Sequence, residues 1–120
     1  MKYFFWIFII LFSQNICIAK HLNPEKYYQQ KWCEACNGIL EYRLTDGARV
    51  DCLTKNYAIE FDFANKWAES IGQSLYYALK TGRKPGVVLI ISDKKDCDKY
   101  LKRLYTVANL HGIRVWTMNE

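Results

Sequence analysis

Hydrophobic and polar residues alternate strictly from residue 57 to residue 63, and a period of two predicts a β-strand. The large apolar side chains of this segment would point to one face of a sheet, whereas Ala58, Glu60 and Asp62 would point to the other. Two carboxylates on one strand face repel each other unless a cation or a proton comes between them. The pattern therefore predicts a chemical site on this strand, and Asp51 joins it if the preceding strand is a neighbour.

Patterns of the same kind predict that the chain is an α/β domain with the element order αβββαβαβ. Asn23 is expected to cap the first helix, and Asn37 with Gly38 to end it. The last strand but one is apolar on both faces, as in a strand that helices cover on both sides. The expected elements are helices over 24–36, 65–79 and 97–110, and strands over 39–44, 48–53, 57–63, 87–91 and 113–116, with a tight turn at 45–47 and a charged loop at 93–96.

The expected helix over 65–79 carries two stripes of side chains. The polar stripe has the i, i+4, i+7, i+11 spacing of one helix face and consists of Lys66, Ser70, Gln73 and Tyr77. The second stripe is expected to face the core and consists of Trp67, Ile71, Ser74, Leu75 and Ala78. If the polar stripe borders the acidic strand face, it places a cation and an amide beside the carboxylates. Such a combination is typical of a metal-dependent phosphodiesterase.

These residues resemble a known nuclease motif. Asp51, a gap of eight residues, Glu60-Phe61-Asp62 and then Gln73-x-x-x-Tyr77 are similar to the PD-(D/E)xK nuclease superfamily, and the last element resembles that of RecB-type nucleases. The resemblance covers about residues 38 to 92. It implies a restriction-endonuclease-like core with a mixed central sheet flanked by helices.

The resemblance also implies a metal site. Asp51 and Glu60, with the main-chain carbonyl of Phe61, would hold Mg²⁺ or Mn²⁺, since such hard cations prefer oxygen ligands. Gln73 would orient the nucleophile or bind the nucleic-acid backbone. Tyr77 would contact the nucleic acid, and packing in the core is its alternative role.

The chain departs from the family pattern at Asp62. The family places a Lys two residues after the acid that corresponds to Glu60, and it is known to move this Lys to a nearby element. Lys66 is the expected substitute, and it would stabilise developing negative charge or position the attacking water. Asp62 would be an additional metal ligand or would orient Lys66.

The family usually has a further acid from its first helix or first strand. Glu41 is the preferred candidate here, and Glu34 is the other. The alternative for Glu41 is a solvated strand residue that pairs with Arg43 or Arg49.

Composition and charge permit a nucleic-acid partner. The chain has 120 residues, 51% of them hydrophobic and 16% aromatic, which indicates one packed domain and excludes a disordered chain. The formal net charge is +5, with basic residues in dispersed pairs. Arg83 and Lys84, at the turn after the helix with the polar stripe, are the expected phosphate contacts.

The N-terminal segment predicts export. An apolar run over 3–12 follows Lys2, and Ala19 precedes an expected cleavage site, as in a secretory signal peptide over 1–19. The domain would then span 20–120, be periplasmic or secreted, and have no stable membrane association after cleavage. An uncleaved anchor is an alternative, and a lipoprotein at Cys17 is disfavoured because Ile16 is not small.

Four cysteines follow the expected cleavage site, and an even number in an exported chain indicates two disulfides. Cys33 with Cys52 and Cys36 with Cys97 is the preferred pairing, and a structural zinc site of all four stays open. Trp-Cys-x-x-Cys also suggests a redox motif. It falls at the end of the expected first helix, however, where the helix dipole does not lower a thiol pKa.

The sequence thus predicts a metal-dependent nuclease that acts outside the cytoplasm, with DNA as the expected substrate. One alternative is a nuclease-like fold that has lost catalysis and binds nucleic acid or a protein. The other is a thiol-disulfide oxidoreductase that uses the Cys-x-x-Cys pair. No pattern indicates an oligomeric state.

Overall fold

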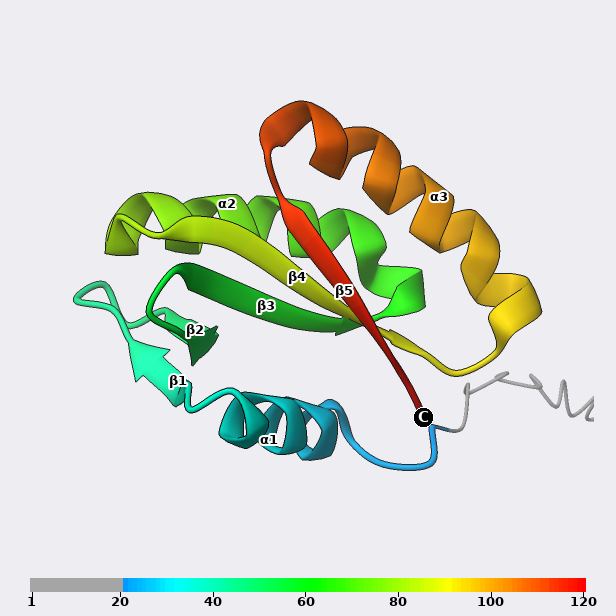
Figure 1. Ribbon diagram of the computed structural model, residues 1–120, viewed down its shortest axis with the longest axis horizontal. Coiled ribbons are helices and arrows are strands. Elements are labelled where there is room, and N and C mark those ends of the chain that lie inside the picture. The colour runs from blue at the N-terminus through cyan, green and yellow to red at the C-terminus, as the bar shows by residue number, and fades with distance from the viewer. Residues whose placement is uncertain (1–20) are drawn as a thin grey trace, which may run out of the picture.

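The computed structural model describes residues 21–120, which form three layers with a five-stranded sheet in the middle (Figure 1). The α/β class and the predicted order of helices and strands are confirmed, with a short 3-10 turn added before the second helix. The predicted signal peptide lies outside the described residues. The elements are α1 (Glu25–Ala35), β1 (Ile39–Arg43), β2 (Arg49–Leu53), β3 (Tyr57–Phe63), η1 (Ala64–Lys66), α2 (Trp67–Thr81), β4 (Lys84–Ile91), α3 (Lys94–His111) and β5 (Arg114–Asn119).

The sheet is mixed, as predicted, with the strand order β1-β2-β3-β4-β5. The first three strands are antiparallel, and β3, β4 and β5 are parallel. β3 and β4 pair along the whole of β3, whereas β2 and β3 pair only at Cys52 with Ile59 and at Leu53 with Ala58. Pairing therefore stops just before Asp51 and Glu60, so β3 has no strand partner on that edge from Glu60 onward.

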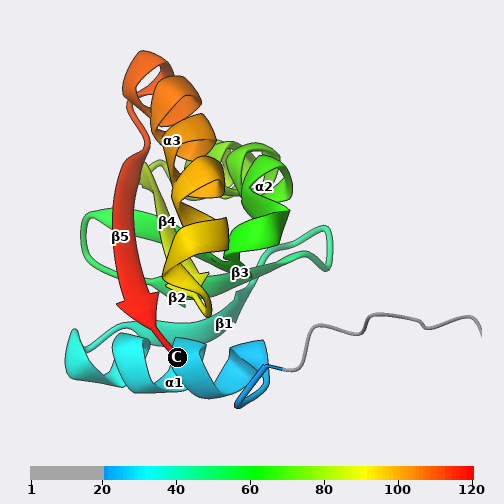
Figure 2. The same cartoon turned by 90° about the vertical axis from the view of Figure 1, so that its right-hand side faces the viewer.

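Helices cover both faces of the sheet. α1 lies on one face, and α2 and α3 lie on the other (Figure 2). The alternation along β3 is confirmed, because Ile59 and Phe61 pack with Cys33 of α1 while Ala58 packs with Tyr77 of α2. The two faces of β4 are both buried, as predicted. No helix among residues 21–120 is long and apolar enough to cross a membrane.

Some predicted element boundaries are wrong. Residues 94–96 belong to α3 and not to a loop, because Asp93 caps that helix by accepting a hydrogen bond from the Lys95 N–H at 3.0 Å. At the start of α1 the N-cap residue is Pro24, and no side chain caps the helix. The predicted cap, Asn23, instead donates to the Tyr28 hydroxyl at 3.5 Å. Asn37 does take the left-handed conformation expected after α1, with φ of 55°.

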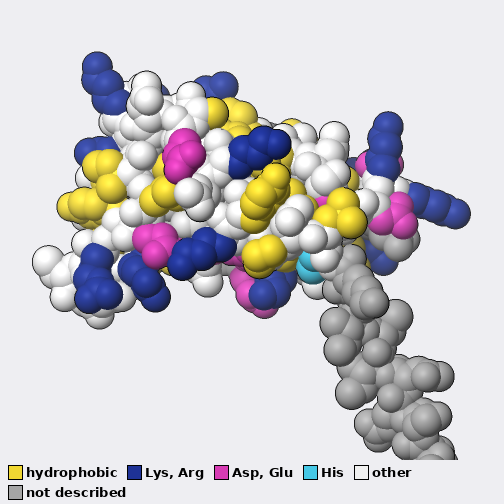
Figure 3. All heavy atoms as spheres, turned by 90° about the horizontal axis from the view of Figure 1, so that it is seen from below, with side chains coloured by type: hydrophobic (Ala, Val, Ile, Leu, Met, Phe, Trp, Pro, Cys, Tyr) yellow, Lys and Arg dark blue, Asp and Glu magenta, His cyan; other side chains and the backbone are white. Residues whose placement is uncertain are grey.

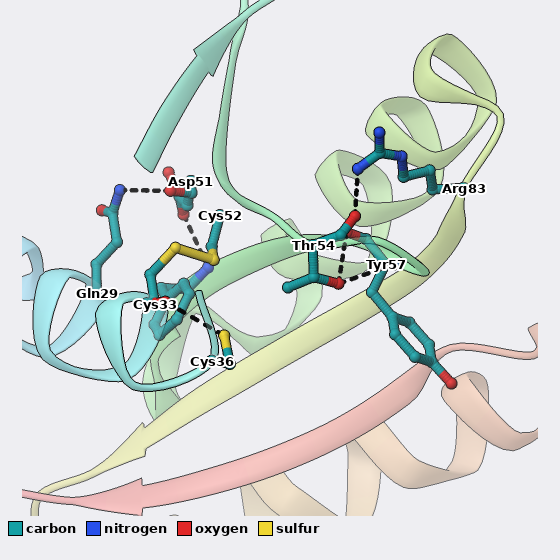
Figure 4. Close-up of a disulfide and its surroundings, with 9 residues drawn as sticks. Gln29, Cys33, Cys36, Asp51, Cys52, Thr54, Tyr57 and Arg83 are labelled. Carbon is teal, nitrogen blue, oxygen red and sulfur yellow. Dashed lines mark hydrogen bonds between the residues drawn. A yellow bond between two sulfur atoms is a disulfide. The ribbon is translucent and has the colours of Figure 1, made fainter. Parts of the chain in front are cut away.

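One of the two predicted disulfides is confirmed. Cys33 of α1 is bonded to Cys52 of β2 (Figure 4). The predicted bond between Cys36 and Cys97 is wrong, because both thiols are free. Cys36 directly follows α1 and Cys97 is on α3, and these helices cover opposite faces of the sheet. The same separation excludes a zinc site of all four cysteines.

The disulfide also bears on the redox alternative. Cys33 is fully buried and bonded to Cys52, so the two cysteines of the Cys-x-x-Cys sequence do not pair with each other. Gly38 leaves the room that this bond needs, since a Cβ there would lie 2.6 Å from the Cys33 sulfur and even closer to that of Cys52.

Candidate active site

Asp51 is held in place by two neighbouring elements. Its Oδ2 accepts a hydrogen bond from the Phe61 main-chain N–H at 2.8 Å, and its main-chain carbonyl accepts one from Gln29 Nε2 of α1 at 2.9 Å (Figure 4). The Phe61 N–H lies on the part of β3 that β2 does not pair with. The Asp51 carboxylate therefore replaces the missing strand partner, which fixes the acid beside β3.

Glu60 and Asp62 are buried acids on the α2 side of β3. Each is only 5% exposed. The Glu60 carboxyl group lies beside that of Asp51, and their interaction raises the pKa of Glu60 and lowers that of Asp51. Gln73 of α2 is oriented so that its side-chain N–H group faces Glu60. It donates to both carboxylate oxygens of Glu60, and its nitrogen lies 3.3 Å from Oε2. The structure thus brings together Asp51, Glu60 and Gln73.

Asp62 has no such partner. Its Oδ2 is buried and is the one buried side-chain polar atom among the described residues without a hydrogen bond. A buried carboxylate oxygen without a partner is costly, because it has lost its hydration without replacement. This atom is therefore available to a cation or a proton donor.

Glu25 of α1 completes the acidic group, and sequence reasoning missed it as a site residue. Its charge acts on Glu60 and Asp62, and the Asp51 charge acts on it. The sequence marked Glu25 only as an acid in the first turn of a helix, where it interacts favourably with the helix dipole. Its position in α1 was a signal, because the resemblance to the nuclease motif led us to expect a further acid from the first helix or first strand.

Of the two residues predicted for that role, Glu34 is exposed and Glu41 lies where its charge acts on Asp51. Glu34 is exposed on α1 and accepts a hydrogen bond from Gln30 at 3.0 Å. Glu41 forms ion pairs with Lys26 at 3.3 Å and Arg49 at 3.6 Å, so the alternative pairing with Arg49 is the one observed. Glu41 has a positive φ of 49° within β1, and its charge makes a small contribution to the pKa of Asp51.

Burial and mutual repulsion raise the pKa of every acid in the group. Desolvation is the largest cause in each case, and the neighbouring carboxylates add to it. The pKa of Glu60 rises to about 11, that of Asp62 to about 8 and that of Glu25 to about 7, and the pKa of Asp51 is raised as well. The group therefore holds protons at neutral pH unless a cation replaces them.

Lys66 lies near the acids but is not paired with them. It ends η1 and is exposed. The charge of Lys66 lowers the pKa of Glu25 and of Asp62, so Lys66 lies near these two acids. Among the described residues, Lys66 has no carboxylate within 4.0 Å. Its ammonium group is thus free to meet a ligand.

Two members of the predicted polar stripe are buried in the core. Ser70 is fully buried and donates to the Trp67 carbonyl at 2.6 Å. Tyr77 packs with Leu53 and Ala58, which confirms the core-packing alternative. Burial, followed by the charge of Glu60, raises the pKa of Tyr77 well above its usual value. Its hydroxyl group therefore lies within the electric field of the acids.

The expected phosphate contacts lie at the other end of β3. Lys84 pairs with Tyr57, five positions before Asp62 along β3, or about 16 Å at the rise of a strand. The Arg83 guanidinium donates to the Thr54 main-chain carbonyl (Figure 4). On the face that Figure 3 shows, Lys and Arg side chains are dispersed among acidic and hydrophobic ones. Phosphate binding by Arg83 and Lys84 stays a prediction.

Among residues 21–120, no three His, Cys, Asp or Glu side chains converge closely enough to hold a metal by themselves. Two carboxylates and a main-chain carbonyl are still a suitable set, since Mg²⁺ takes one or two carboxylates and keeps several waters. No family model, no curated protein and no solved structure matches this chain. Its function is therefore inferred from its own residues.

Proposed function

We propose that this chain is a metal-dependent nuclease of the PD-(D/E)xK type, which hydrolyses a phosphodiester bond of DNA outside the cytoplasm. The observation that supports this most strongly is the group of buried acids at the edge between β2 and β3. Glu60 and Asp62 are each 5% exposed, and an oxygen of Asp62 has no partner. Acids in such a place need a cation or bound protons, and a structural core needs neither.

Asp51, Glu60 and the Phe61 carbonyl would hold Mg²⁺ or Mn²⁺. The N–H and C=O groups of one strand residue point to the same edge, so the Phe61 carbonyl faces Asp51 as its N–H does. All three ligands are oxygens, as a hard cation requires. Once bound, the cation supplies a Lewis acid for the scissile phosphate and an ionised water at neutral pH.

Gln73, Lys66 and Glu25 would orient the ligands, neutralise negative charge and transfer protons. Gln73 donates to Glu60 and thereby fixes the direction of its carboxylate. Lys66 stands free beside Asp62 and would neutralise the negative charge that develops on the phosphate. Glu25, whose pKa is about 7, is able to take up or release a proton there at neutral pH.

Cleavage of labelled DNA tests this proposal. The disulfide-intact protein should cut DNA with Mg²⁺ or Mn²⁺ and not with EDTA. Glu60→Gln should lower the rate by about a thousandfold or more, because it removes a ligand, and Lys66→Ala by about a hundredfold. Glu34→Gln is the matched control, since it removes an exposed acid of α1 and should leave the rate unchanged.

One observation favours a second candidate, a nuclease-like fold that binds nucleic acid or a protein without cutting. Asp62 stands where the family has its Lys, and Lys66 is not held by any described carboxylate. A folded protein that binds DNA but does not cut single-stranded or double-stranded DNA or RNA with either metal would replace the nuclease by this candidate.

A further inference from the structure

A pocket of about 240 Å³ opens between the turn that joins β1 to β2 and the C-terminal end of α2. Leu44 and Leu53 form part of its wall. Its polar lining includes Arg43, Lys80 and Arg83, together with the hydroxyl groups of Tyr42, Thr45 and Thr81. The pocket has no role in the proposed metal site.

The lining of this pocket is positively charged. No Asp or Glu lines it, and none of its three basic side chains has a described carboxylate within 4.0 Å. Asp46, outside the lining, acts on Lys80, but its carboxylate already accepts hydrogen bonds from the Tyr76 hydroxyl and the Ala48 N–H. Because like charges repel, such a site favours an anion between them.

The pocket lies on the same side of the sheet as the acidic group, towards the other end of β3. Lys80 follows Gln73 by seven positions, so both lie on one face of α2, about 10 Å apart along the helix axis. Tyr77 lies between them and packs on the same leucines that form the pocket wall, Leu44 and Leu53. About 10 Å corresponds to roughly three nucleotides at the 3.4 Å axial rise of one DNA strand.

We propose that this pocket binds a backbone phosphate of the nucleic-acid strand that is cut at Asp51 and Glu60. The proposal rests on the proposed function, because it assigns the substrate of the same site. Arg43 and Lys80 would contact the phosphate, and Arg83, held by the Thr54 carbonyl, would support it. Tyr42, which is 40% exposed and lines the pocket, offers an aromatic face for a base, and a free phosphate would not use that face.

Binding of a short labelled single-stranded DNA in EDTA tests this proposal without reading cleavage. The probe is titrated against wild type, Arg43→Gln, Lys80→Gln and the double variant at several salt concentrations. Lys31→Gln is the matched control, because it removes one exposed cation from α1, on the opposite layer. Glu60→Gln is included because it changes the acidic group and leaves the pocket intact. Circular dichroism confirms that each variant is folded.

Each pocket variant should bind roughly fivefold more weakly at 0.1 M salt, and the slope of log K against log salt should fall by about 0.7 for each basic side chain that is replaced. Lys31→Gln and Glu60→Gln should bind as wild type does. Inorganic phosphate should compete only weakly, since it lacks the base that Tyr42 would stack on. The proposal is overturned if wild type does not bind the DNA, if the pocket variants bind like Lys31→Gln, or if phosphate alone binds as tightly as the DNA does.

Discussion

At the residue scale, the protonation of Glu60 and Asp62 is expected to set how the stability of the protein depends on pH. Their pKa values in the folded protein are about 11 and about 8, against ordinary values of 4.5 and 3.8. A carboxyl group with a raised pKa binds its proton more tightly when folded. Its contribution to stability is thus fully present below the ordinary pKa and is lost as the pH rises towards the folded value. Without a divalent cation, the free energy of unfolding should fall between about pH 5 and pH 8.

Glu60→Gln should remove much of this pH dependence, because Gln keeps the shape and a hydrogen-bond donor but never ionises. In EDTA, its free energy of unfolding relative to wild type should rise by on the order of 1 kcal/mol per pH unit between about pH 5 and pH 8. Urea unfolding at several pH values measures this, with Glu34→Gln as the exposed control. Parallel profiles for wild type and Glu60→Gln would show that Glu60 is not protonated in the folded protein.

Sequence patterns located some site residues and not others. Strand alternation selects Glu60, helix periodicity selects Gln73 and motif spacing adds Asp51, and the structure brings these three residues together. Glu25 was missed because its approach to β3 depends on how α1 packs across the sheet, which no local pattern contains. The full burial of Ser70 was not evident from the sequence, because its hydroxyl group is satisfied locally by the carbonyl of Trp67.

The separation of β2 from β3 is the decisive feature at the element scale. The two strands pair at only two residue pairs, and beyond them the Asp51 carboxylate and not a strand carbonyl accepts the Phe61 N–H. The disulfide supports this arrangement, since it joins α1 to the residue next to Asp51. The strands and helices themselves were predictable, because hydrophobic residues recur about every 2 residues in a strand and every 3.6 residues in a helix. The start of α3 was not, because the helix begins with Lys94 and Lys95, which are charged and exposed.

Removal of the disulfide tests its contribution to stability. Cys33→Ser with Cys52→Ser should lower the free energy of unfolding by about 3 kcal/mol, the loop-closure term for a bond across 19 positions. Cys36→Ser is the matched control, because its thiol is exposed and free, and it should change stability little. Urea unfolding measures both variants. An equal loss in Cys36→Ser would instead show that Cys36 shares the bond.

The arrangement of the whole molecule follows from two consecutive crossovers. β3, β4 and β5 are parallel and advance in one direction, so right-handed connections place α2 and α3 on the same face. α1 then covers the other face (Figure 2). This explains why the predicted bond between Cys36 and Cys97 is wrong, because a pairing by cysteine count ignores the sheet between them. The fold class was predictable from local patterns, whereas this pairing required the strand order.

Calorimetric titration with Mg²⁺ and Mn²⁺ tests the central claim that the buried acids form a metal site. Wild type should bind each metal at neutral pH and release protons, since the cation displaces those held by the acids. Asp51→Asn and Glu60→Gln should each abolish binding. Glu41→Gln should retain it, because Glu41 pairs with Lys26 and Arg49 outside the proposed ligand set. Absence of binding by the folded wild type, or binding that survives both Asp51→Asn and Glu60→Gln, would contradict the metal site.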